Sequence, residues 1–452
     1  MIILHKGTIV TSENEAVGSI VIEDGKISEV LYSDAPDFDS RMSKIMKDNP
    51  EAEIRHLEGK HVMAGGIDAH VHFREPGLTH KADISTESRA AVAGGVTTVF
   101  DMPNTSPATV SAENLKNKIG LAEGRSLAKI GFHIGATNSN AMEISNLVKR
   151  GDADTGITPD DIAGVKVFMG SSTGNMLVDS GSSLDGLFAI KEKPVLVHCE
   201  DEATIKANLA AATEKYGEDI PFTEHENIRS RRACIMSSIK ALELAIKHGT
   251  RLTLCHISTK EEIEMVRAAK INNPEIIAET SCNYLWFSNE DYNRLGSRVK
   301  CNPSVKTPED RAALRRALAD GLIDTIGSDH APHLPEEKDG CYTKAPSGLP
   351  SIQQSLPVLI TIAMEEEIPL TVIASVFSEK ASEIYKLNRG KIKAGYEADL
   401  VIFEPEKEFI VRNDDQFSKC GWTPYEGVTL YGKIDSVLID GMTVFREGEI
   451  TA

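Results

Sequence analysis

Short apolar runs alternate with helical segments through the middle of this chain, and this alternation constrains the fold more than any other feature. Segments with helical periodicity, such as Ser230–His248, Lys260–Ile271 and Pro308–Asp320, lie between the runs. Eight strands alternating with helices predict an α/β fold, a (β/α)8 TIM barrel. An open doubly wound sheet is the competing architecture, but no glycine-rich fingerprint follows the first run. The eight runs are Gly66–His72, Val96–Met102, Lys129–Gly135, Ala163–Phe168, Pro194–His198, Arg251–His256, Glu275–Glu279 and Leu322–Ser328.

The two ends of the chain have a different pattern, with short strand-like runs separated by turn signals such as Glu23-Asp24-Gly25 and Asp440-Gly441. We expect both ends to pair into one small β-sandwich domain, which brings the termini together. The predicted division is residues 1–60 and 386–452 for this domain and 61–385 for the catalytic barrel. The strand-like runs are Met1–Leu4, Thr8–Val10, Ser19–Ile22, Lys26–Leu31, Asp399–Phe403, Glu408–Val411, Ser436–Ile439 and Thr443–Phe445.

The charge and cysteine content restrict the partners and the compartment. The formal net charge is −19, which disfavours nucleic acid or an anionic membrane as a partner but leaves room for a local cationic pocket. Seven cysteines, an odd number without regular spacing, indicate a reducing compartment. The N-terminal segment lacks the pattern of a secretory signal, and no stretch has the length of a membrane span. These features predict a cytoplasmic protein and do not argue against a small anionic substrate.

A pair of histidines, His70 and His72, ends the first apolar run. Residues two apart on a strand point to the same face, so both rings can bind one metal ion. The pair lies at the carboxyl end of its strand, where the active sites of such barrels lie. One such pair alone is weak evidence, because many are surface accidents.

Three further runs end in possible metal ligands: His198, His256 and Asp329. A single histidine of this kind is more often a core or loop residue with satisfied ring nitrogens. Four histidines and an aspartate at strand ends are hard to explain in that way, because burial together without a metal would leave polar groups unpaired. Imidazole and carboxylate ligands suit Zn²⁺, and other divalent transition ions remain alternatives.

Lys166 lies within the apolar run Gly164–Phe168, where an ammonium is costly unless it is modified or paired. One interpretation is carboxylation by CO₂, which converts the amine to an anionic carbamate that can bridge two metal ions. The other is a lysine that extends to the solvent at the barrel rim. The residues alone leave both open, and the neighbouring metal ligands favour the carbamate.

Four motifs resemble those of the dihydroorotases, which are cyclic amidohydrolases of the amidohydrolase superfamily, and the resemblance covers nearly the whole chain. The segment Pro424–Gly427 and the flanking strand-like runs also resemble the accessory sheet domain of that family. Together these motifs are highly specific. They are His70-Val71-His72-Phe73-Arg74-Glu75-Pro76-Gly77, Asp101-Met102-Pro103-Asn104-Thr105, Ser328-Asp329-His330-Ala331-Pro332-His333 and Ala345-Pro346-Ser347-Gly348.

The resemblance implies a role for each matching residue. His70, His72 and Asp329 would bind the more buried of two Zn²⁺ ions, His198 and His256 would bind the second, and carboxylated Lys166 would bridge them. A bridging hydroxide would be the nucleophile, with Asp329 as general base and then general acid. The substrate-binding residues would be Arg74, Asn104, Asn302 and His333.

The implied reaction is the reversible hydrolysis of (S)-dihydroorotate to N-carbamoyl-L-aspartate, a step of pyrimidine biosynthesis. The alternatives are a dihydropyrimidinase (hydantoinase) or an allantoinase, which act on uncharged rings, a deaminase of the superfamily, which tends to use one metal, and an inactive scaffold. Family members are commonly dimers or larger, and some associate with aspartate carbamoyltransferase, so the assembly stays open.

Three positions depart from the pattern of many relatives. Asn283-Tyr284 stand where a histidine is frequent, Gln353-Gln354 where a glutamate is common, and Arg232 where a glutamate often follows Arg231. None of these is a matched metal ligand. They leave the subgroup and the assembly open.

Overall fold

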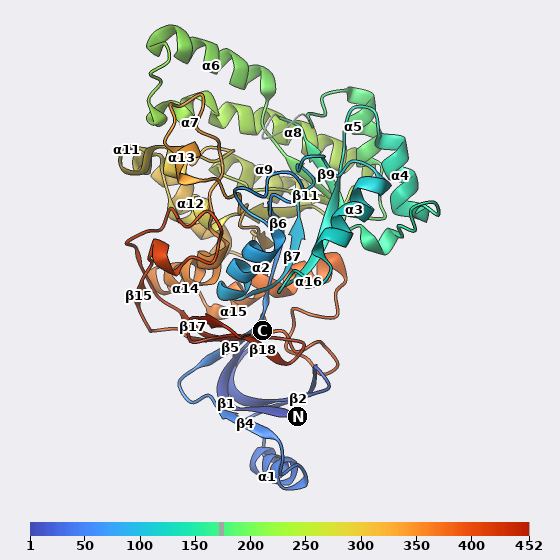
Figure 1. Cartoon of the computed structure of the whole chain (residues 1–452), viewed down its shortest axis with the longest axis vertical. Helices are drawn as coiled ribbons and strands as arrows, with labels where there is room; N and C mark the ends of the chain where they lie inside the picture. The colour runs from blue at the N-terminus through green and yellow to red at the C-terminus, as the bar shows by residue number, and fades with distance from the viewer. Residues whose placement is uncertain (171–175, 452) are drawn as a thin grey trace.

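The computed structural model describes residues 1–170 and 176–451, and its centre is a barrel of parallel strands (Figure 1). Each strand pairs with its neighbours in chain order, and an isolated bridge between Val71 and His330 joins the last strand to the first. The predicted (β/α)8 barrel is therefore confirmed, and the open sheet is excluded. The barrel strands are β6 (Gly66–Val71), β7 (Val96–Asp101), β8 (Lys129–Gly135), β9 (Gly164–Phe168), β10 (Val195–His198), β11 (Leu252–Leu254), β12 (Ile277–Thr280) and β13 (Thr325–Ile326).

Helices cover the outside of the barrel, and their ends follow local capping chemistry. The side chain of Thr259 accepts a hydrogen bond from Glu262 N at 3.2 Å, and the carboxylate of Glu262 accepts one from Thr259 N at 3.2 Å, so a helix begins there. The expected helices near 230–248, 260–271 and 308–320 are present within one residue at each end. The longer helices are α2 (Ile84–Ala93), α3 (Ala112–Ala122), α4 (Ala141–Arg150), α5 (Gly181–Phe188), α6 (Glu202–Tyr216), α8 (Arg231–His248), α9 (Lys260–Lys270), α12 (Pro308–Ala319) and α14 (Ser355–Glu365).

Shorter helices lie in the loops, and α1 lies outside the barrel, against the terminal sheet (Figure 1). Among the described residues no helix is long and apolar enough to cross a membrane. The shorter helices and α1 are α1 (Phe38–Asp48), α7 (His225–Ile228), α10 (Cys282–Trp286), α11 (Tyr292–Leu295), α13 (Pro335–Lys338), α15 (Leu370–Ala374) and α16 (Lys380–Tyr385).

Both ends of the chain build one nine-stranded sheet below the barrel, in the order β19-β18-β17-β14-β5-β1-β2-β3, with β4 paired to β1 (Figure 1). Strand β5 connects the N-terminal and C-terminal parts of this sheet, because it pairs with β1 on one side and with β14 on the other. The expected β domain shared by both termini is confirmed, and its limits at residues 60 and 385 stay predictions. Its strands are β1 (Ile2–Val10), β2 (Glu15–Glu23), β3 (Lys26–Tyr32), β4 (Glu53–His56), β5 (His61–Ala64), β14 (Leu400–Glu404), β17 (Lys433–Ile439), β18 (Met442–Arg446) and β19 (Glu449–Ile450), with a separate pair β15 (Phe409–Ile410) and β16 (Thr429–Leu430).

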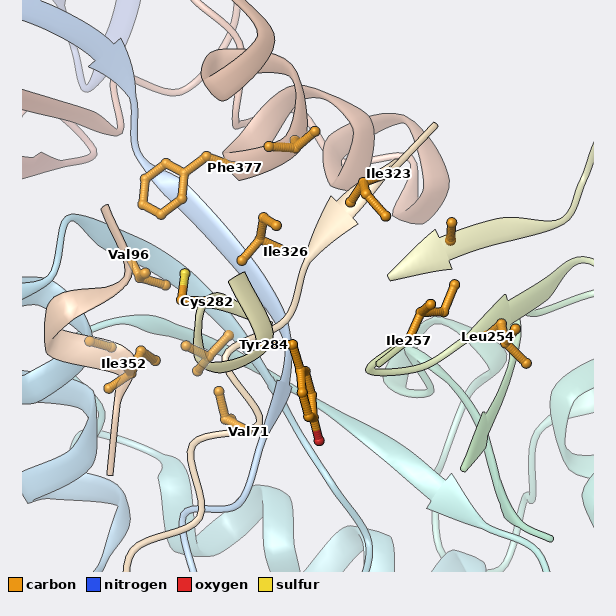
Figure 2. Close-up of a cluster of buried hydrophobic side chains, with 14 of the residues drawn as sticks. Val71, Val96, Leu254, Ile257, Cys282, Tyr284, Ile323, Ile326, Ile352 and Phe377 are labelled. Carbon is orange, nitrogen blue, oxygen red and sulfur yellow. The ribbon is translucent and has the colours of Figure 1, made fainter. Parts of the chain in front are cut away.

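Buried apolar side chains between the barrel strands and the surrounding helices form the main core (Figure 2). Val71 of β6, Leu254 of β11 and Ile326 of β13 belong to it, and Tyr284 directs its hydroxyl out of the cluster to donate to Pro303 O at 2.7 Å. Because strand side chains alternate, the burial of Val71 in this layer turns His70 and His72 to the other side. The packing of the outer layer thus positions the polar residues at the barrel mouth.

Candidate metal centre

Five residues from distant parts of the chain meet at the carboxyl ends of the barrel strands. His70 Nε2 and His72 Nε2 lie 3.5 Å and 3.0 Å from Asp329 Oδ1. His198 Nδ1 lies 2.9 Å from His256 Nε2, and the ring centres of His70 and His256 are 5.2 Å apart. The structure therefore brings together the four histidines and the aspartate that the sequence singles out, in two adjacent groups.

The backbone at this site adopts costly conformations. His256 and Asp329 have φ values of +40° and +50°, and Arg74 has +65°. Left-handed backbone at residues other than glycine costs about 1–3 kcal/mol each and persists where the surrounding structure imposes it. Three such residues lie around one barrel mouth, where the surrounding structure holds their side chains in place.

The far nitrogen of three of the rings is held by a hydrogen-bond acceptor. His70 Nδ1 donates to Glu279 Oε1 at 2.7 Å, and His198 Nε2 donates to Glu200 Oε2 at 2.9 Å. His72 Nδ1 donates to Asn104 Oδ1 at 2.7 Å. A ring that donates its proton in this way presents a lone pair from its other nitrogen, which is the usual arrangement of histidines that bind metal.

Burial sets the charge state of these groups. It holds the pKa values of His70 and His256 well below the ordinary value, so both rings are neutral at pH 7. Burial alone would raise the pKa of Asp329, but His70 and His72 outweigh it and hold that pKa below its ordinary value. Neutral imidazoles around an ionised carboxylate are the form that a divalent cation requires. The residues present thus fit a metal ion.

A second group of ligand-type side chains, His70, Cys255 and Glu279, also clusters in the interior. The hydrogen bond from His70 Nδ1 to Glu279 accounts for the approach of these two. Burial raises the pKa of the Cys255 thiol well above its ordinary value, so without a metal ion it is a neutral thiol at neutral pH. Within this group, Glu279 supports the ring of His70 through their hydrogen bond.

Lys166 lies on β9 beside these ligands and is fully buried. Its ammonium donates to Cys255 Sγ at 3.4 Å and lies 5.1 Å from the centre of the Phe168 ring. Within residues 1–170 and 176–451 it forms no ion pair with a carboxylate. The interpretation of Lys166 as a residue that extends to solvent is wrong, because the side chain has no exposed surface. The carbamate interpretation remains.

A small recess opens beside Asp329, and its lining residues are His72, Arg74, Asn302, Asp329, Ala331, Ser347 and Gly348. Arg74 is buried, donates through Nε to Pro332 O at 3.1 Å and through Nη2 to His333 Nε2 at 3.0 Å. Burial lowers its pKa to about 10, so the guanidinium is charged at neutral pH. It forms no ion pair with any carboxylate of the described residues.

The four predicted substrate residues hold different places around this recess. Arg74 and Asn302 line it, and the Oδ1 atom of Asn302 is buried without a hydrogen-bond partner in the part of the chain that the structure describes. His333 packs behind Arg74. Asn104 stands behind His72, whose ring it orients. The recess therefore offers a cation and an unpaired acceptor to whatever binds there.

Sequence reasoning missed two carboxylates, Glu200 and Glu279, that orient the ligand rings. Both had a signal in the sequence. Glu200 stands two residues after His198, and Glu279 is the last residue of the seventh predicted strand run. Residues at these places share the inward direction of the ligands at the strand ends.

The sequence profile of the Amidohydrolase family matches residues 61–444. The chain belongs to the amidohydrolase family. Among its amidohydrolase relatives, a dihydroorotase of Methanosarcina acetivorans is 34% identical over 96% of this chain and 89% of that protein. An allantoinase of Desulfitobacterium hafniense is 29% identical over 100% of this chain and 96% of that protein.

The solved structures agree with this assignment. An L-hydantoinase (dihydropyrimidinase) from Arthrobacter aurescens superposes with a TM-score of 0.89 and 25% identity, over 100% of this chain and 97% of that one. The resemblance inferred from the motifs is therefore confirmed. Amidohydrolases are generally metal-dependent, and this chain contains groups of side chains that could hold a metal ion. These relatives are named for different cyclic amides, and the recess is the part of the site that would distinguish one ring from another.

Proposed function

We propose that this amidohydrolase is a dihydroorotase, which interconverts dihydroorotate and N-carbamoyl-L-aspartate in the cytoplasm for pyrimidine biosynthesis. The supporting observation is Arg74, a buried guanidinium that lines the recess without an acidic partner among the described residues. A planar guanidinium can bind a carboxylate through two parallel hydrogen bonds. Dihydroorotate and its product both carry a carboxylate.

The runner-up is a hydantoinase or an allantoinase, in line with the allantoinase relative and the hydantoinase structures. The rings that hydantoinases and allantoinases act on are uncharged. Such a ring would leave the charge of Arg74 buried and unpaired, which is costly. Dihydroorotate therefore suits this site better.

For the metal, we propose two Zn²⁺ ions, one held by His70, His72 and Asp329 and the other by His198 and His256, with carboxylated Lys166 shared between them. Metal bound there would lower the pKa of a water molecule and polarise the carbonyl of the ring. The carbamate also explains the burial of Lys166, since modification would replace an ammonium that lies beside a thiol and an aromatic ring and forms no ion pair among the described residues.

The protein's own groups would bind the ring and move the proton. The guanidinium of Arg74 holds the substrate carboxylate, and Asn302 Oδ1 accepts a hydrogen bond from a ring N–H. Asp329 takes the proton of the attacking water and returns it to the ring nitrogen as the C–N bond breaks. In the synthetic direction protonated Asp329 assists the loss of water. A homo-oligomer and an association with aspartate carbamoyltransferase stay predictions.

The test is a panel of rings given to one sample of purified protein. Dihydroorotate hydrolysis is followed by ultraviolet absorbance and compared with allantoin, hydantoin and dihydrouracil, with metal content measured on the same sample. We expect the highest kcat/KM for dihydroorotate. A higher value for any uncharged ring would contradict the proposal, and inactivity towards all four rings in metal-replete protein would favour the inactive scaffold.

A further inference from the structure

Two buried lysines lie behind the wall of the substrate recess that Ser347 and Gly348 form. Lys338, the last residue of α13, is fully buried. Its ammonium donates to Pro346 O at 2.8 Å, Gly348 O at 3.1 Å and Lys300 O at 3.2 Å. An ammonium has three N–H donors, so all of them are used, and all of them go to main-chain carbonyls.

The second lysine, Lys300, binds the main chain of residues that precede Pro346 in the loop 342–348. Its ammonium donates to Tyr342 O at 2.7 Å and Ala345 O at 2.6 Å, and its own carbonyl accepts a hydrogen bond from Gly348 N at 3.0 Å. The loop 342–348 is thus tied to Lys300, which stands two residues before the recess residue Asn302.

A buried histidine adds a further tie to this loop. His225 Nε2 donates to Cys301 O at 2.8 Å, which leaves Nδ1 to accept a hydrogen bond from the Tyr342 hydroxyl at 2.7 Å. The loop is therefore fixed at both ends to the segment that carries Asn302. Side-chain and main-chain bonds together make the wall of the recess rigid.

The wall also fits closely against the residues beneath it. Gly348 has φ +141°, and a Cβ atom there would lie 2.5 Å from Ala331 O and 3.0 Å from His333 Cδ2. Ser347 O lies 3.1 Å from His333 Nε2. A shift of a few tenths of an ångström in this loop would therefore change the recess and disturb His333, which packs on Arg74.

The charges around Lys338 distinguish it from other buried lysines. Burial lowers its pKa, and the charged groups Lys300, Arg298 and Arg74 lower it further. Lys306 is buried too, but it lies near Glu200 and Glu262, whose carboxylates it stabilises. Neither Lys300 nor Lys338 forms an ion pair among the described residues. The partners of both lysines are therefore main-chain carbonyls of the recess wall and its neighbours.

We propose that Lys338, together with Lys300, is a positioning residue for an anionic substrate. It fixes the loop 342–348 as the wall of the recess beside the place where Arg74 receives a carboxylate. Neither lysine touches the substrate. The inference rests on the proposed function, because it takes the recess to be the substrate site.

The test compares Lys338→Met, which keeps the length of the side chain but removes its charge and donors, with Lys270→Met. Lys270 is the control, since its ammonium pairs with Asp324 Oδ2 at 2.6 Å. Asp324 directly precedes β13, at the opposite end of that strand from Asp329. For Lys338→Met we expect the KM for dihydroorotate to rise about tenfold, with kcat within about threefold and metal content unchanged. For Lys270→Met we expect lower thermal stability and an unchanged KM.

An unchanged KM in folded Lys338→Met, or an equal rise of KM in Lys270→Met, would overturn the inference. If Lys338→Met does not fold, Lys300→Met carries the same test, with the same rise of KM expected and the same contrary result. Failure of the proposed function would be recognised separately, because the unsubstituted protein would then not hydrolyse dihydroorotate.

Discussion

Replacing Arg74 by methionine removes the guanidinium on which the substrate assignment depends and changes little else. Methionine is close in length and flexible, so it can fill the same space. It also adds no new backbone strain, because Arg74 already has φ +65° with a Cβ atom in place. The hydrogen bonds lost within the protein are those to Pro332 O and His333 Nε2. The metal ligands keep all their contacts.

The size of the effect depends on which N–H groups of the guanidinium remain to bind the substrate carboxylate. Nε and one Nη2 proton are engaged within the protein, so further N–H groups remain for a carboxylate. A hydrogen bond between charged groups contributes about 1.5–3 kcal/mol, so the loss of a buried bidentate pair costs about 3–4 kcal/mol. At about 1.4 kcal/mol for each factor of ten, the KM for dihydroorotate should rise roughly 100- to 1,000-fold.

The assay is initial-rate hydrolysis of dihydroorotate by both proteins, with metal content and thermal unfolding measured on the same samples. Arg74→Lys is the matched control, because it keeps the charge without the planar fork and should give an intermediate KM. A KM within about threefold of the unsubstituted protein would refute the assignment of Arg74, and so would loss of metal from Arg74→Met.

Three further perturbations test other parts of the account. Lys166→Ala should lose most of its metal and activity, and unchanged metal content on elemental analysis would contradict the bridging role. Glu279→Gln should weaken metal binding about 10- to 100-fold in competition with a chelator, because the acceptor that orients His70 is weakened; equal affinity would remove Glu279 from that role. Burial and then Arg229 lower the pKa of Lys300 to about 8 in the folded protein, whereas an unfolded lysine titrates near about 10.4, so the folded state releases this proton first. Stability relative to Lys300→Met should therefore rise between about pH 8 and pH 10 in urea unfolding, and a constant difference would show that Lys300 titrates normally.

The sequence was sufficient for the barrel and for the side chains at its mouth, because both depend on local periodicity. Each apolar run of the middle region contains a strand, and the period of two places His70 and His72 on one face. The boundaries of the strands do not follow from the runs in the same way. The runs Met1–Leu4 and Thr8–Val10 are one strand, β1, whose register shifts between Leu4 and Gly7.

Contacts between distant side chains could not be derived in this way. The buried carboxylate of Glu87 accepts hydrogen bonds from His330 Nε2 at 2.7 Å and from the Ser418 hydroxyl at 2.6 Å, and so links α2, the end of the barrel and the C-terminal region. The three carbonyls around Lys338 likewise belong to the main chain of a loop. Neither residue stands in a periodic pattern, because its partners are set by tertiary folding alone.

Titration of metal-free protein with Zn²⁺ in the presence of bicarbonate tests the central claim most directly, with bound metal and dihydroorotate hydrolysis measured at each step. If His70, His72, Lys166, His198, His256 and Asp329 hold a pair of ions, activity should reach its plateau at two equivalents per chain. Full activity in protein without bound metal, or a plateau at one equivalent, would contradict the account.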